Sequence, residues 1–266
     1  MVVIGLGQAG QNICESVANM SNIRTVILDA GKGIPKSVSH ESYEQNVPKL
    51  GKKLKLGKEQ DIWFVVCGAG MIASATLAIL EQMQDRNVRV ALISPDPFLL
   101  SKTQTKHNKV VWNVLQEYAR SGLLNAVYFV SNGSMINIVG ESPLTSYYDK
   151  MNELVFNCVH SINVFGDTEP IFGGTHEPKD ISRIRTFAFR EIEKEQKKLF
   201  FPLDNITETC YIYSINETEL EMNSNLISEI KESMDKDIIS SFSIYPTSHQ
   251  FSYAYAIYYT HFTQEV

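Results

Sequence analysis

Three glycines near the amino terminus have the spacing of a phosphate-binding loop. Gly5, Gly7 and Gly10 follow the apolar run 2–4 and precede a segment with helical periodicity. A glycine-rich turn between a strand and a helix presents backbone N–H groups and a helix N-terminus to an anion. The loop therefore predicts a ligand that carries phosphate.

The same spacing also matches the fingerprint of dinucleotide-binding proteins. Asp29 ends the second expected strand, 25–28, where such proteins place the acid that binds ribose. On these residues, a nicotinamide or flavin enzyme is an alternative interpretation.

Two further strand ends carry residues suited to a ligand. The small residues 68–70 follow the apolar run 62–66, with the hydroxyl groups of Ser74 and Thr76 just beyond. Asn132 follows the apolar run 126–130. Ligands of open α/β sheets bind where loops leave the carboxyl ends of the strands, so we expect these loops to meet.

A tyrosine and an asparagine share one face of a long expected helix. Tyr148 and Asn152 are four residues apart, so both side chains can contact one ring. An Asn amide offers a donor and an acceptor together, which suits the edge of a guanine. A packed tyrosine and a surface asparagine would show the same spacing. The pair therefore indicates a ligand site only when it is considered together with the upstream loops.

The elements that must position these residues alternate along the first half of the chain. Expected strands at 2–4, 25–28, 62–66, 88–93 and 126–130 alternate with expected helices at 11–20, 73–83 and 102–121. Segment 31–60 is expected to be a long loop with at most one short helix. This alternation predicts an α/β fold with a doubly wound, mainly parallel sheet.

The second half of the chain has a different pattern of expected helices and strands. A long helix is expected at 147–163, followed by a loop at 166–179 that is rich in glycine, proline and acids. Expected strands at 209–215, 238–245 and 251–262 enclose a helix at 220–234, which predicts a smaller α+β domain.

The sequence resembles the tubulin/FtsZ superfamily over roughly residues 2–262. The loop Gly-Gln-Ala-Gly-Gln-Asn at 7–12, the strand and loop 61–70, Asn132 and the segment 143–154 carry the resemblance. It implies a guanine-nucleotide-binding domain at 1–146, a central helix at 147–164 and a C-terminal α+β domain at 165–266. A divergent prokaryotic or phage-type member is the best match, because the chain lacks the extra C-terminal helices of eukaryotic tubulin.

The resemblance also implies ligands and contacts. GTP or GDP would bind with Mg²⁺, and no metal site made by the protein alone is expected. Tyr148 would cover the guanine and Asn152 would bind its edge. The residues implied to bind the nucleotide are Gly7, Gln8, Ala9, Gln11, Asn12, Asp29, Gly68, Gly70, Ala73, Ser74, Asn132, Tyr148 and Asn152.

Two acids three residues apart match the family's catalytic loop. Glu177 and Asp180 would complete the nucleotide site of the next subunit, so that hydrolysis depends on head-to-tail assembly into filaments. An acid there can orient the water that attacks the γ-phosphate. Acids that cap the N-terminus of a helix would give the same pattern without catalysis.

The second glycine loop departs from the family. Where the family has glycines interrupted by a threonine, this chain has Met71, Ile72 and Ala73. Bulky residues are expected to obstruct the approach of backbone to phosphate, and a β-branched residue at positive φ is costly. A scaffold of the same fold that does not hydrolyse GTP is therefore an alternative function.

The net charge and the cysteine content limit the classes of partner that we expect. The net charge of −6 argues against nucleic acid as the main partner, and the lysines at 52–58 are interpreted as a solvated loop. Four dispersed cysteines indicate reduced thiols and not a disulfide or zinc framework. No signal peptide or membrane-spanning run is apparent, so a cytoplasmic location is expected.

Overall fold

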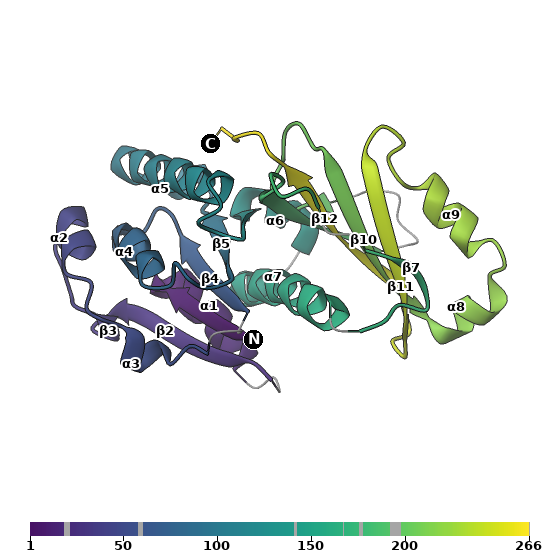
Figure 1. The fold of residues 1–266 in the computed structure, drawn as a ribbon, viewed down its shortest axis with the longest axis horizontal. Coiled ribbons are helices and arrows are strands. Elements are labelled where there is room, and N and C mark those ends of the chain that lie inside the picture. The colour runs from purple at the N-terminus through teal and green to yellow at the C-terminus, as the bar shows by residue number, and fades with distance from the viewer. Residues whose placement is uncertain are drawn as a thin grey trace.

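The computed structural model describes residues 1–18, 22–57, 61–140, 143–166, 168–175, 178–191 and 198–265. Its first half is a run of parallel strands with helices between them (Figure 1). The strands are β1 (Val2–Leu6), β2 (Arg24–Ala30), β3 (Gly33–Ile34), β4 (Ile62–Cys67), β5 (Val88–Ser94) and β6 (Ala126–Ser131). The helices are α1 (Gly7–Val17), α2 (His40–Gln45), α3 (Gly51–Leu54), α4 (Thr76–Glu81), α5 (Lys102–Arg120) and α6 (Asn132–Val139).

The central helix α7 (Leu144–Gly166) leads into the second half, which contains mostly antiparallel strands. The strands are β7 (Phe172–Gly174), β8 (Ile184–Glu191), β9 (Lys198–Leu199), β10 (Glu208–Asn216), β11 (Ile239–Thr247) and β12 (Tyr253–Thr260). Two helices, α8 (Glu217–Met222) and α9 (Leu226–Glu232), connect β10 to β11. Because this connection contains helices, β10 and β11 can lie parallel.

One continuous path of paired strands joins the two halves. Its order is β3-β2-β1-β4-β5-β6-β8-β12-β10-β11-β7, with β9 paired to β8. The neighbours from β2 to β8 along this path are parallel, and β12 is antiparallel to both β8 and β10. The expected mainly parallel, doubly wound sheet is confirmed, and it continues without interruption into the second half.

Helices cover both faces because the buried strands alternate their side chains. On β1, Ile4 belongs to the hydrophobic cluster that includes residues of α4 and α5, whereas Val3 belongs to the cluster that includes Ile13 of α1 and Val155 of α7. Each face therefore has its own hydrophobic layer. Figure 1 shows α1 and α7 beside each other on one side of these strands.

Several boundaries differ from the expectations. Segment 31–60 contains two short helices, α2 and α3, instead of at most one. The expected helix at 220–234 is divided into α8 and α9, because Asn223 at the end of α8 has an extended ψ of 92°. The strand β8 and the helix α6 were not expected, and β8 is the strand that links the two halves.

Candidate functional site

In the first glycine loop, which contains Gly5, Gly7 and Gly10, backbone segments lie in close contact. Gly7 begins α1 directly after β1 and has φ +68°, a conformation that costs glycine little. A Cβ on Gly10 would lie 2.7 Å from Gly5 backbone atoms and 2.7 Å from the carbonyl oxygen of Val65. The glycines thus bring α1 against the ends of β1 and β4, so that the start of the helix lies at the carboxyl edge of the sheet.

A hollow of about 440 Å³ opens at this edge, and we call it the loop pocket. It is bounded by the first loop, the second loop, the turn after β5, the start of α6 and the first turns of α7. The structure brings eight of the thirteen expected nucleotide-binding residues together in its lining. They are Gly7, Gln8, Ala9, Asn12, Gly70, Asn132, Tyr148 and Asn152.

Tyr148 and Asn152 lie on α7 as their spacing predicts. Tyr148 is 48% exposed, so part of its side chain is accessible to a ligand, and Asn152 is half-buried. Tyr147 packs edge-on against Tyr148, with ring centroids 5.4 Å apart, and supports it. This end of the pocket combines an aromatic face with an amide, which is suited to a planar, hydrogen-bonding ring.

The lining also includes residues that sequence reasoning missed. Pro95 and Leu100 come from the turn after β5, and Gln104 comes from the first turn of α5. The proline-rich turn at 94–97 was visible in the sequence as a strand end, which was the signal available for them. None of the lining residues that the structure describes is Lys, Arg, Asp or Glu, so an anion here would rely on backbone N–H groups and amide side chains.

Five expected residues lie outside this lining. Gln11 donates from Nε2 to Glu15 Oε1 at 2.7 Å, along the outer face of α1. Asp29 accepts from the backbone N–H of Ala30 at 2.8 Å and closes its own turn. The structure therefore gives the dinucleotide interpretation no support, because that interpretation needs Asp29 in the pocket.

The other three belong to the second loop. Ala73 is buried in the core, and the Gly68 carbonyl accepts a hydrogen bond from His107. Ser74 Oγ lies 2.8 Å from His40 Nδ1 and 2.9 Å from His107 Nε2.

The hydrogen bonds around His107 have one consistent assignment. His107 Nδ1 lies 2.9 Å from the carbonyl oxygen of Gly68, which can only accept, so Nδ1 carries the proton. Neutral Nε2 then accepts from the Ser74 hydroxyl, and that hydroxyl accepts from His40. Burial lowers the pKa of His107, and the neighbouring His40 lowers it further, which favours this neutral form.

The backbone of the second glycine loop, after β4, does not have the strain that bulky residues at positive φ would cause. Residues Met71–Ala75 form a short 3₁₀ helix, and Gly70 has φ −73°, so neither Met71 nor Ile72 adopts positive φ. Ile72 lines the pocket, and its Cγ2 would lie 2.8 Å from a Cβ on Gly7. The expected obstruction is therefore an apolar side chain that lines the pocket and not a strained backbone.

Of the two expected catalytic acids, the structure describes only Asp180. Glu177 lies outside the described residues. Asp180 is exposed in the turn before β8, and the described residues 178–183 form no helix that it could cap. The turn is fixed by the buried Glu208, whose carboxylate accepts from Ser182 Oγ at 2.7 Å and from the Lys179 backbone N–H at 3.3 Å.

Asp180 and the loop pocket belong to opposite ends of neighbouring strands. Asp180 precedes the amino end of β8, which pairs in parallel with β6, whereas Asn132 follows the carboxyl end of β6. A strand of six residues is about 20 Å long, so one subunit cannot bring Asp180 to its own loop pocket.

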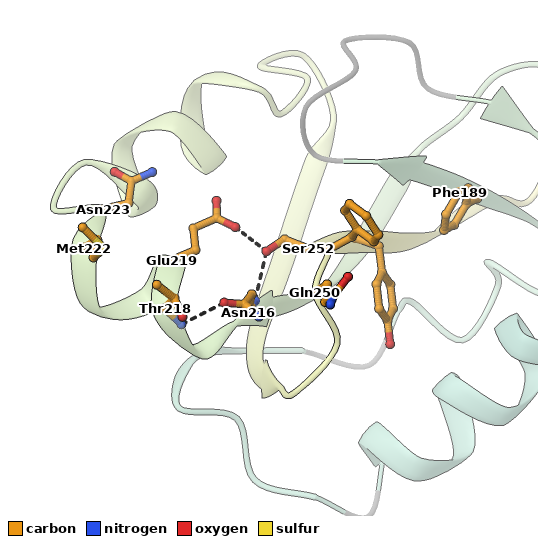
Figure 2. A pocket seen from close by; sticks show the side chains of 10 residues that line it. Phe189, Asn216, Thr218, Glu219, Met222, Asn223, Gln250 and Ser252 are labelled. Atoms are coloured by element: carbon orange, nitrogen blue, oxygen red, sulfur yellow. Dashed lines mark hydrogen bonds between the residues drawn. The ribbon is translucent and has the colours of Figure 1, made fainter.

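A larger hollow, of about 840 Å³, lies near α8. Figure 2 shows Asn216 bonded to Thr218 and Ser252, with Glu219 also bonded to Ser252. The backbone N–H groups of Asn216 and Thr218 donate two of these bonds, and the exposed Met222 and Phe251 also border the hollow. The hollow contains no expected site residue.

The strand order and the pocket between the loops define the class of protein: the chain has the tubulin/FtsZ fold. TubZ of Bacillus thuringiensis serovar israelensis, in a GTPγS-form protofilament, superposes with TM-score 0.75 at 14% identity, over 99% of this chain and 86% of TubZ. CetZ2 of Haloferax volcanii, a GTPγS-bound protofilament, gives TM-score 0.71 at 13% identity, over 97% and 92% of the two chains.

FtsZ of M. jannaschii, in an empty dimer, gives TM-score 0.66 at 12% identity, over 97% of this chain and 87% of FtsZ. No protein-family model and no curated protein matches the sequence. At these identities the likeness establishes the fold. Within the described residues, no helix is both long and apolar enough to cross a membrane.

Proposed function

We propose that this protein binds guanine nucleotide in the loop pocket and assembles head to tail into filaments, with GTP hydrolysed between subunits. The observation that carries the proposal is the convergence of eight expected residues, from four separate segments, on one hollow. These residues are far apart in the sequence, and the fold brings them to one place at the carboxyl ends of the strands.

Each part of the nucleotide has a suitable partner. Tyr148 offers an aromatic face to the base, and Asn152 offers an amide to its edge. Gly7 and Gln8 at the start of α1 present backbone N–H groups to phosphate. Mg²⁺ would be held chiefly by phosphate oxygens and water, where it neutralises charge on the nucleotide.

Exposed apolar side chains at both ends of β5, β6 and β8 support assembly. Near the loop pocket, Phe98 is 97% exposed and Leu99 is 70% exposed. At the opposite strand ends, Leu123 is 50% exposed and Ile181 is 57% exposed. Apolar side chains at both ends are suited to a contact between unlike surfaces, which repeats without closing.

A second candidate function is a filament or scaffold that binds nucleotide without hydrolysis. It is favoured by the second loop, where Ile72 lines the pocket and Ser74 is bonded to two histidines. In this case Asp180 would have a structural role in the contact between subunits.

The experiment is to purify the protein, identify bound nucleotide by ion-exchange chromatography of the denatured supernatant, and then add GTP and Mg²⁺. Light scattering at 90° follows assembly, and release of inorganic phosphate follows hydrolysis. ATP at the same concentration is the control for base selectivity.

The first proposal predicts guanine nucleotide in the supernatant, scattering that rises with GTP, and phosphate release that depends on protein concentration. Scattering without phosphate release would select the second candidate. Absence of bound nucleotide together with absence of scattering, at several salt concentrations, would refute both.

A further inference from the structure

Four cationic residues border a third hollow, at the strand ends opposite the loop pocket. This hollow of about 240 Å³ is bordered by Arg89, Lys179, Arg183 and Arg185, and we call it the arginine hollow. Arg89 lies at the amino end of β5, Arg185 lies at the amino end of β8, and the other two belong to the turn before β8. Residues far apart in the sequence are therefore gathered at one place.

Arg185 is held rigidly inside the wall of the hollow. Its guanidinium carbon lies 5.5 Å from the ring centroid of Tyr128 and 5.0 Å from that of Tyr259. It donates to Tyr128 Oη at 3.0 Å and to the Ser182 carbonyl at 3.2 Å. Among the described residues, no carboxylate lies within salt-bridge distance of it, so its permanent charge has only neutral partners.

Arg183 is also fixed by neutral groups. It donates from Nε to the Asp180 carbonyl at 2.6 Å and from Nη1 to the Leu124 carbonyl at 3.0 Å. Of the three arginines, only Arg89 has a salt bridge in the described part of the chain, to Asp61 at 3.3 Å.

Among the described residues, positive charge is in excess at the hollow. The four cations face the carboxylates of Asp180, which borders the hollow, and Asp61. The carboxylate of Glu208 accepts hydrogen bonds from Ser182 Oγ and from the backbone N–H of Lys179, both in the turn before β8. Even when Glu208 is counted, the cations outnumber these carboxylates by one. Charged groups removed from water are costly unless a counter-charge satisfies them.

We propose that the arginine hollow binds a small oxyanion, a phosphate or a carboxylate group. Guanidinium groups present planar forks of N–H donors that match the oxygens of either group, and held in place they lose little freedom on binding. The site is separate from the loop pocket and does not depend on nucleotide binding. Its occupant is either a free anion or an oxyanion carried by the adjoining subunit of a filament.

The test uses dilute ¹⁵N-arginine-labelled protein, at a concentration where light scattering shows no assembly. Inorganic phosphate and acetate are titrated in separate experiments, with sodium chloride at matched ionic strength as the reference. The Nε–Hε signals of Arg183 and Arg185 should shift and saturate with at least one anion, while the signal of Arg120 on α5 stays in place. These signals locate the binding, because no arginine is among the described residues that line the loop pocket.

Variants separate binding from a purely structural role of the arginines. Lys179→Gln and Arg183→Gln should each weaken anion affinity by about tenfold, the factor expected for one charge-assisted hydrogen bond. Arg120→Gln removes the same charge from an exposed site and should leave the affinity unchanged. Lys179 is exposed and bonds through its backbone, so the Lys179→Gln variant remains informative if Arg183→Gln fails to fold.

Absence of a saturating shift with either anion, or equal affinity in Lys179→Gln, would overturn the proposal. A second arm identifies the source of the oxyanion. If the adjoining subunit supplies it, phosphate should inhibit assembly of the unmodified protein and Lys179→Gln should raise the critical concentration. If a free anion is the occupant, neither effect should appear although the arginine signals shift. The titration needs no assembly, so it stands even if the proposed filament does not form.

Discussion

At the scale of single residues, the proposed selectivity for guanine depends on Tyr148 and Asn152. Asn152→Leu removes both the donor and the acceptor, and we expect GTP affinity to fall roughly tenfold to a hundredfold. Asn152→Asp keeps an acceptor for the N–H groups of guanine and should retain most of the affinity. Equilibrium dialysis with labelled GTP measures both.

Asn137 provides the matched control for that prediction. It is an exposed asparagine on α6, outside the lining of the loop pocket, so Asn137→Ala should bind GTP like the unmodified protein. Unchanged affinity in Asn152→Leu would show that the base does not bind at this end of the pocket.

His107 gives stability a dependence on pH. Its pKa is lowered from 6.5 in the folded protein by burial, so the unfolded chain takes up a proton first as the pH falls. The free energy of unfolding should be largest above pH 6.5 and should decrease as the pH falls from there through the lowered pKa. Urea titrations at several pH values measure this slope.

The substitution His107→Gln should remove much of that slope below pH 6.5, whereas His249→Gln, at an exposed position between β11 and β12, should preserve it. An identical slope in the His107 variant would mean that other groups govern acid sensitivity.

At the scale of elements, the first loop depends on close contact between backbones. Gly10→Ala places a methyl group within 2.7 Å of Gly5 and of the Val65 carbonyl, and only backbone movement can relieve the clash. We expect a loss of about 1–3 kcal/mol in the free energy of unfolding, the usual cost of overpacking. Urea denaturation checks it.

Gly51→Ala is the comparison for that loss. A Cβ on Gly51 has no atom within 4 Å, and Gly51 lies at the start of α3 without positive φ. This change should be neutral or slightly stabilising, by about 0.5 kcal/mol. Equal effects at the two glycines would contradict the close-contact explanation.

The elements that sequence reasoning predicted well are those with strong apolar periodicity. The strands β1, β4, β5 and β6 and the helices α5 and α7 were all expected, with boundaries shifted by a few residues. Because the loops follow from these strands, eight of the seventeen lining residues could also be predicted.

The missed strand β8 shows why the rest could not. Its eight residues include two arginines, a threonine and a glutamate, so the segment looks too polar for the middle of a sheet. Only the folded structure places the rings of Tyr128 and Tyr259 on either side of Arg185. Similarly, the bonds from Ser74 to His40 and His107 join residues more than thirty positions apart, and no local pattern indicates them.

At the scale of the whole molecule, the separation of Asp180 from the loop pocket requires that any catalysis by this acid occur between subunits. Asp180→Ala should bind GTP normally and lose about a hundredfold or more of its phosphate release, as for a lost catalytic group. Mixing it with Asn152→Leu should restore part of the activity, because one variant supplies the nucleotide and the other supplies the acid.

The control mixture pairs Asp180→Ala with Asp237→Ala, which changes an exposed acid before β11. The Asp237→Ala chain has both an intact Asp180 and an intact loop pocket, so this mixture sets the upper limit for the recovered rate of phosphate release. If Asp180→Ala alone hydrolyses GTP at the full rate, the acid has no catalytic role.

The absence of charged side chains from the described lining of the loop pocket has a consequence for how such a protein responds to electrolyte. A nucleotide held by oriented dipoles and amides forms no ion pair with the protein that added salt could screen. Its affinity should therefore change little when ionic strength rises. Contacts made through the arginine hollow would weaken over the same range, so salt would act on the joints between subunits while each subunit kept its nucleotide.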